Sequence, residues 1–146
     1  MSDHAAIYIA DPSILDSRLF DQIDGILSYE GLSEGDSATG FRLMLEAGQV
    51  RMNFMPQEQV AKHLEGFAGY AETVITDKDL LLYTRSRIYY VRLVCGCVIT
   101  PGFDDDGKIE EFLFQFNCAV NGLLFFADTI FDYDGESLGG NITTAS

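Results

Sequence analysis

Residues 108–130 read KIEEFLFQFNCAVNGLLFFADTI, and this stretch decides the fold that the sequence predicts. Apolar residues recur at helical spacing, and further apolar residues occupy the side that a surface helix keeps polar. The pattern therefore predicts one long helix, Lys108–Ile130, that is apolar around nearly its whole circumference. Such a helix must be covered on most sides, either within its own domain or by a second chain.

We expect the second chain to be another copy of the protein. Phe114, Cys118 and Phe125 lie off the main apolar stripe, so a single sheet face would leave them uncovered. Exposed apolar patches of that size are uncommon on soluble monomers, and a two-fold dimer is the commonest oligomer. The alternative is a central helix, with the predicted Lys78–Ile88 helix and the C-terminal segment wrapped over it.

The segments before this helix alternate between strand and helix patterns. Ala5–Ala10 and Tyr89–Thr100 are apolar on both faces, which predicts two central strands. A helical stripe over residues 19–27 predicts a helix that ends near Gly31. Ser33–Gly40 has the composition of a loop.

The clearest local pattern is a β-hairpin followed by a helix. Apolar and polar residues alternate over Phe41–Leu45 and Val50–Phe54, on either side of a turn that contains glycine. Pro56 then begins a helix that runs to Val74, and Lys78–Ile88 forms a shorter one. The hairpin residues expected to face the core are Phe41, Leu43, Val50, Met52 and Phe54.

Together these segments predict a single α+β domain over residues 1–140, with helices packed on an antiparallel sheet. Their order, β-α-β-β-α-(α)-β-α, matches the split β-α-β arrangement of ferredoxin-like folds, with the apolar C-terminal helix as an addition. Residues 131–140 are expected to hold one short strand or turn. Residues 141–146 are predicted to form a flexible polar tail.

The chain is strongly acidic at both ends. Its formal net charge is −14; residues 1–41 carry eight acids and one base, and residues 93–146 carry nine acids and one base. Phosphate backbones and anionic membranes attract basic surfaces, so the sequence disfavours both as partners. A cationic protein partner fits this charge, and the alternative is that the acidity only maintains solubility.

The sequence predicts a soluble, cytoplasmic protein. It has no apolar leader that follows Lys or Arg, and no apolar run approaches the ~20 residues of a membrane helix. Three cysteines in such a chain predict reduced thiols.

The cysteines are predicted to be core residues rather than metal ligands. Cys95 and Cys97 share one face of a strand, and Cys118 lies on the long helix that is expected to pack over it. Zinc usually takes four nitrogen or sulfur ligands, and no fourth ligand appears at a suitable spacing. Cysteine in apolar surroundings behaves as a small hydrophobic residue.

An acidic turn before the long helix resembles part of a calcium loop. Asp104 and Asp106 precede Gly107 at the spacing of an EF-hand. The first and the closing ligand positions, however, hold Gly102 and Leu113, which supply no carboxylate. We therefore interpret the turn as a helix N-terminus that carboxylates stabilise, and we expect neither a metal ion nor another cofactor.

His63 is the one histidine that the sequence places on a regular element, the helix after Pro56. It is a candidate general base or ligand residue, but no acid or nucleophile accompanies it at a recognisable spacing. The favoured interpretation is a partly solvated histidine at the border of the apolar stripe. The GxGxxG, GxxxxGK[ST] and GxSxG motifs are absent from the sequence.

The single basic cluster combines three arginines with three tyrosines: Arg85, Arg87, Arg92, Tyr83, Tyr89 and Tyr90. Arginine and aromatic residues are enriched in protein interfaces. The cluster is therefore a candidate dock for an anionic ligand or for an acidic patch of a second subunit. The alternative is a solvated helix end.

The function that these observations favour is non-catalytic: a protein-interaction or accessory module. One alternative is a small-molecule-binding protein or a hydrolase that uses acidic residues and His63. A concave pocket that holds His63 or converging carboxylates would favour this alternative. Another is an acidic, immunity-type or antitoxin-type neutraliser of a cationic protein, which requires a contiguous acidic face from residues 11–36 and 103–136.

Overall fold

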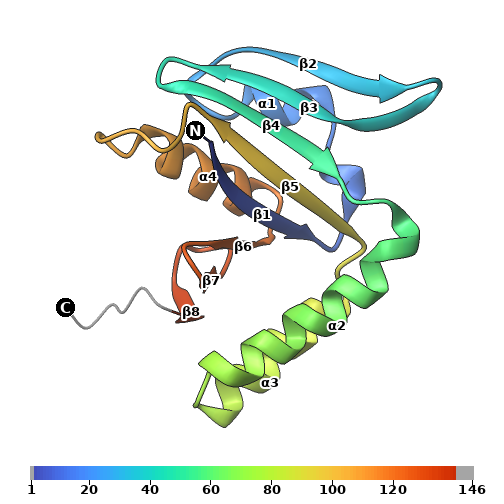
Figure 1. The fold of residues 1–146 in the computed structure, drawn as a ribbon, viewed down its shortest axis with the longest axis vertical. Coiled ribbons are helices and arrows are strands. Elements are labelled where there is room, and N and C mark those ends of the chain that lie inside the picture. Colours follow the sequence, from blue (N-terminus) through green and yellow to red (C-terminus); the bar gives the residue numbers. More distant parts are fainter. Residues whose placement is uncertain (1, 141–146) are drawn as a thin grey trace.

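The computed structural model describes residues 2–140, and its main feature is an eight-stranded antiparallel sheet with helices against it (Figure 1). The strands are β1 (Asp3–Ile9), β2 (Ile26–Glu34), β3 (Ser37–Leu45), β4 (Gly48–Phe54), β5 (Leu93–Thr100), β6 (Leu123–Phe126), β7 (Thr129–Phe131) and β8 (Ser137–Gly140). The helices are η1 (Pro12–Ile14), α1 (Ser17–Asp21), α2 (Gln57–Val74), α3 (Lys78–Tyr89) and α4 (Lys108–Ala119).

The strand order across the sheet is β2-β3-β4-β5-β1-β6-β7-β8. The predicted α+β class with an antiparallel sheet is confirmed. The ferredoxin-like order is not, because the described residues form eight strands where that order predicts four. The predicted tail, residues 141–146, lies outside the described part of the chain.

The central strands β1 and β5 overlap the two predicted strands and pair with each other, but β5 begins only at Leu93 because α3 continues to Tyr89. Their side chains alternate between two apolar cores: Ile7 and Ile9 face one core, and Tyr8 faces the other. Helices α1 and α4 cover the first face of the sheet, with Phe116 in the middle of that core. Helices α2 and α3 cover the second face. The sheet therefore has helices on both faces.

The predicted helix Lys108–Ile130 is wrong beyond Ala119. The chain leaves α4 through Asn121, whose φ of 52° is left-handed, and continues as β6 and β7. Leu124 and Phe126 enter the first core, whereas Leu123 and Phe125 enter the second. The segment is apolar on every side because it is a buried strand between two cores, and a short apolar run has no periodicity that separates strand from helix.

This correction removes the reason for the dimer predicted through that helix. Phe114 and Phe125 pack against the two cores of their own chain, and Cys118 is exposed. The surface that the prediction assigned to a partner chain is therefore largely covered from within.

The N-terminal half holds a second correction. The predicted helix stops at Asp21, and Gly25, with a φ of 92°, leads into strand β2. Part of the predicted loop Ser33–Gly40 is strand, because β2 and β3 form a hairpin through it. Leu27 extends the helical spacing in the sequence, but its side chain is exposed in β2.

The predicted hairpin of β3 and β4 is confirmed, with Leu43 opposite Val50 and Phe41 opposite Met52. Leu43, Val50 and Met52 are buried in the first core, as expected. Phe41 and Phe54 are half-buried and meet edge to face, with ring centroids 5.6 Å apart. Phe54 therefore buries less apolar surface in the core than a fully buried aromatic residue would.

The acidic turn before α4 stabilises that helix through Asp104. Its carboxylate accepts hydrogen bonds from the backbone N–H of Ile109 at 2.9 Å and of Lys108 at 3.1 Å. These backbone hydrogen bonds, above all the one from Ile109, hold the pKa of Asp104 below its ordinary value. This carboxylate satisfies backbone donors at the start of α4 that have no partner within the helix.

We predict that Asp104→Ala lowers the melting temperature at neutral pH. A folded-state pKa below the unfolded value gives stability that is present above the unfolded pKa and lost as pH falls through the folded pKa. The difference from the unsubstituted protein should therefore shrink on acidification and vanish once Asp104 is protonated in the folded state. Circular dichroism melts over a pH series measure this, with the exposed Asp105→Ala as control. A difference that persists in strong acid would contradict the assignment.

Candidate functional site

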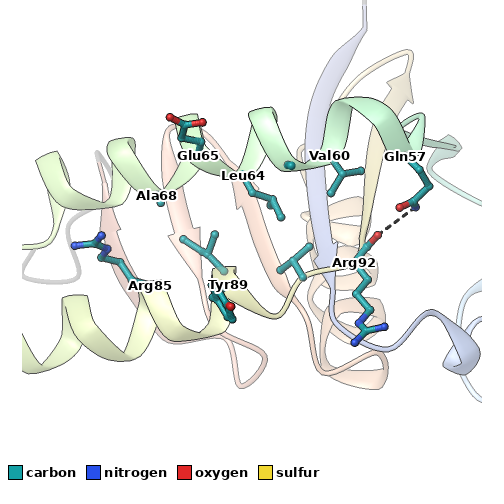
Figure 2. Close-up of a pocket in the computed structure, with 11 residues that line it drawn as sticks. Gln57, Val60, Leu64, Glu65, Ala68, Arg85, Tyr89 and Arg92 are labelled. Atoms are coloured by element: carbon teal, nitrogen blue, oxygen red, sulfur yellow. Dashed lines mark hydrogen bonds between the residues drawn. The ribbon is translucent and has the colours of Figure 1, made fainter.

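A groove of about 710 Å³ lies between α2 and α3 (Figure 2). Its apolar lining is Val60, Ala61, Leu64, Ala68, Ile88 and Val91. Its polar and aromatic lining is Gln57, Glu65, Arg85, Tyr89 and Arg92.

The groove lies where α2 and α3 pack against the second core, and its buried lining residues Val60, Ile88 and Val91 belong to that core. On α2, Phe67 and Ala71 are buried in the second core, and on α3 Ile88 is buried there. The two helices lie side by side (Figure 1), and the groove runs between them. The side chain of Gln57 donates a 3.2 Å hydrogen bond to the carbonyl oxygen of Arg92 and so joins the two walls at one end.

Three residues of the predicted basic cluster line this groove: Arg85, Tyr89 and Arg92. Tyr89 is 81% exposed, and Tyr90 meets its ring edge to face at 5.4 Å. Neither Arg85 nor Arg92 forms a salt bridge with a described residue. With Glu65 as its one acidic lining residue, the groove is locally cationic in an acidic protein.

The other two members of the cluster, Tyr83 and Arg87, form a separate network with Asp132. The guanidinium of Arg87 donates to Asp132 Oδ1 at 2.8 Å and to the carbonyl oxygen of Asn121 at 2.7 Å. The Tyr83 hydroxyl donates to Asp132 Oδ2 at 2.6 Å. Burial, with a further contribution from Asp132, raises the pKa of Tyr83, so the hydroxyl keeps its proton. This network, which we call the Asp132 latch, connects α3 to the turn between β7 and β8.

His63 lies outside the groove, beside a shallow hollow that Met55, Glu58 and Lys62 also line. Its Nε2 is hydrogen-bonded to the hydroxyl of Tyr8 at 2.8 Å. Tyr8 is buried and stacks on Phe67, and burial raises the pKa of the phenol far above its ordinary value. No carboxylate among residues 2–140 is hydrogen-bonded to His63. The contact that His63 makes is structural, because its hydrogen bond to Tyr8 connects α2 to β1.

A second hollow, of about 580 Å³, lies between the N-terminus of α4 and the turns before β2 and after β3. Its carboxylates come from both acidic ends of the chain and from the hairpin turn: Asp24, Glu46, Asp104, Asp106 and Glu111. Lys108 and the apolar side chains of Leu27 and Phe112 complete the wall. Within the described residues, no group of three His, Cys, Asp or Glu side chains is arranged to hold a metal ion.

The three cysteines do not meet. Cys95 and Cys97 are buried in the first core, whereas Cys118 is exposed on α4, so the prediction that the cysteines are core residues is wrong for Cys118. Burial raises the pKa of Cys95 to about 12 and also raises the pKa of Cys97. Both buried thiols are therefore protonated and unreactive at neutral pH.

The sequence gives no sign of the role of Asp132, because its partners Arg87 and Tyr83 are 45 and 49 positions away in the chain.

Within the described residues, no helix is long and apolar enough to cross a membrane. Comparison with protein-family models, curated proteins and solved structures finds no match to this chain.

Proposed function

We propose that this protein is a non-catalytic protein-interaction module, and that the outer face of α2 and α3 is its contact surface. The observation that carries the proposal is the groove itself, where an exposed tyrosine and two arginines that form no salt bridge with residues 2–140 surround an apolar floor. A partner segment with apolar and acidic side chains complements such a groove.

The side chains on this surface are the types that dominate binding energy. Tyr89, at the end of α3, is 81% exposed, and Tyr90, directly after the helix, is 65% exposed. Tyrosine and arginine anchors in a desolvated centre contribute most of the affinity of typical interfaces. Charge complementarity at Arg85 and Arg92 would add specificity and faster association.

The alternative of a hydrolase or small-molecule-binding protein draws support from the carboxylates that converge on the second hollow, but not from His63. His63 lies outside the groove, and its ring nitrogen is hydrogen-bonded to a buried phenol rather than to an acid. We place the module in the cytoplasm, because Cys95 and Cys97 are free thiols in the core, which suits a reducing compartment.

Site-specific photo-crosslinking tests the proposed surface. p-Benzoylphenylalanine at position 89 should give protein adducts in cells, and the Arg85→Glu substitution should remove them. The control is the same probe at position 18, an exposed residue of α1 away from the groove. Equal adduct formation at the two positions, or none at position 89, would refute the proposed surface.

A second candidate function is the neutralisation of a cationic protein. The observation in its favour is the acidic hollow, which brings carboxylates of residues 11–36 and 103–136 together around an apolar wall. Titration with an oligolysine peptide tests it: Asp106→Asn and Glu111→Gln should weaken binding, and Glu58→Gln, outside the hollow, should not. Equal binding by all three variants would exclude the hollow.

A further inference from the structure

Part of the second face of the sheet carries no helix. Among the described residues, the second core, which α2 and α3 cover, takes side chains from β1, β5, β6, β7 and β8 and none from β2, β3 or β4. Figure 1 shows α2 and α3 extending from the ends of β4 and β5 and away from β2 and β3. The second face of β3, β4 and the adjoining part of β5 is therefore open.

Strand pairing identifies the side chains on this open part of the sheet. Paired residues of neighbouring strands lie on one face, and the face alternates along each strand. Because Leu43, Val50 and Met52 are buried in the first core, the residues next to them lie on the other face. The open sheet face comprises His4, Arg42, Met44, Gln49, Arg51, Asn53, Gly96, Val98 and Thr100, all of them exposed or half-buried.

The open sheet face is basic, although the chain is acidic. The whole chain has 23 acidic residues and nine Lys or Arg residues. The nine residues of the face include two arginines and a histidine, but no Asp or Glu. At the border of the face, Glu30 of the edge strand β2 forms a salt bridge with Arg42. The strand register therefore gathers positive charge on a surface that no helix covers.

The two arginines of this face lie directly opposite each other, Arg42 on β3 and Arg51 on β4. Like charges in directly opposite positions destabilise a sheet. Glu30 offsets the charge of Arg42, but Arg51 forms no salt bridge with residues 2–140. The Nε of Arg51 donates a 3.0 Å hydrogen bond to the side-chain oxygen of Asn53, which is neutral. Arg51 is thus an exposed cation that lacks a counter-charge among the described residues.

Apolar groups lie beside these charges. Met44 is 39% exposed, and Val98, which pairs with Arg51 across β4 and β5, is half-buried. Arginine and methionine are enriched in protein interfaces, and a partner that covers Met44 removes apolar surface from water. The face has no Phe, Tyr or Trp, the side chains on which single-stranded nucleic acids stack their bases. A protein partner therefore fits this surface better than a nucleic acid does.

We propose that the open sheet face binds an acidic segment of a partner protein, with carboxylates at Arg51 and Arg42 and apolar side chains over Met44. Charge complementarity selects this occupant, because the face is basic and holds an arginine without a counter-charge. A two-fold dimer through this face would set one basic face against another, so the partner is a different protein. The inference goes beyond the proposed function and does not depend on it, since the groove between α2 and α3 has other residues.

An NMR titration of the isotope-labelled protein with a decaglutamate peptide tests the proposal. At physiological salt the Debye length is about 8 Å, so the peptide senses local charges more than the net charge of the chain. The amide signals of residues 42, 49, 51 and 98 should shift. Arg51→Gln should raise the dissociation constant by about fivefold, whereas Arg51→Lys keeps the charge and should retain binding. Arg18→Gln, at an exposed position on α1, is the matched control.

A melting curve separates binding by Arg51 from a structural role. Because Arg51 faces a like charge, Arg51→Gln should leave the melting temperature unchanged or raise it. The proposal would be overturned by an absence of shifts on these strands, by shifts confined to α2 and α3, or by equal binding of the Arg51→Gln variant. Shifts of the same signals when the protein is concentrated without peptide would identify a second copy as the occupant, which also contradicts it.

Discussion

Replacing Phe116 by alanine is expected to lower the free energy of unfolding by about 3–5 kcal/mol. The Phe116 side chain is 0% exposed and lies on α4 within the first core. The centroid of its ring lies 6.0 Å from the ring centroid of Phe112 and 6.1 Å from that of Phe20, so Phe116 connects α4 to α1. Alanine removes the buried apolar surface and leaves a cavity that helices on a sheet cannot readily close.

Urea unfolding followed by circular dichroism measures this loss. Phe114→Ala is the matched control, because Phe114 lies on the same helix and is only half-buried. Its loss should be clearly smaller than that of Phe116. A domain typically has about 5–15 kcal/mol of stability in total, so the Phe116 variant should be close to unfolding. Equal losses at the two positions would mean that α4 packs through a different face.

The sequence predicts the elements whose internal pattern and end signals agree. The β3–β4 hairpin alternates on both sides of its turn. Pro56 precedes α2, and the side chain of Asp77 accepts a hydrogen bond from the backbone N–H of Leu80 at the start of α3. Strands β1 and β5 are apolar on both faces because both faces are covered. In these segments, local propensity and tertiary packing favour the same structure.

The prediction fails where a strand is too short to show its own period. Leu123–Phe126 contributes to two cores, and its apolar residues extend the stripe of α4 in the sequence. Asn121-Gly122 was the available signal, since this dipeptide is typical of turns. A second turn follows at Ala127 and Asp128, with φ of 52° and 58°, and joins β6 to β7 as a two-residue hairpin loop.

The candidate site was predicted in part. The three arginines and three tyrosines are close together in the sequence. On a helix, however, neighbouring residues point to different sides, so these side chains do not form one group. Tyr83 and Arg87 are four positions apart and share one side of α3, whereas Arg85 and Tyr89 share another. That spacing was readable from the sequence. The partner Asp132 was not, because it is remote in the chain and only the fold brings it to α3.

Removing the carboxylate of Asp132 should therefore have the second large effect, a loss of about 3 kcal/mol in the free energy of unfolding. Asp132 is buried and Arg87 is mostly covered, so Asp132→Ala leaves a guanidinium and the Tyr83 hydroxyl without their shared acceptor. A charge left unpaired out of water costs more than the pair itself contributes. Tyr83→Phe removes the hydroxyl that donates to Asp132 and accepts from Arg87 at 2.9 Å, and it should cost only about 1–2 kcal/mol, because no buried charge loses its partner.

A double-mutant cycle separates this latch from ordinary packing. Arg87→Ala combined with Asp132→Ala should cost less than the sum of the two single losses, because the first substitution already breaks the interaction. Strictly additive losses would contradict the latch. Hydrogen exchange adds a local test: Asp132→Ala should speed exchange in α3 more than in α4, since the carboxylate binds α3 directly.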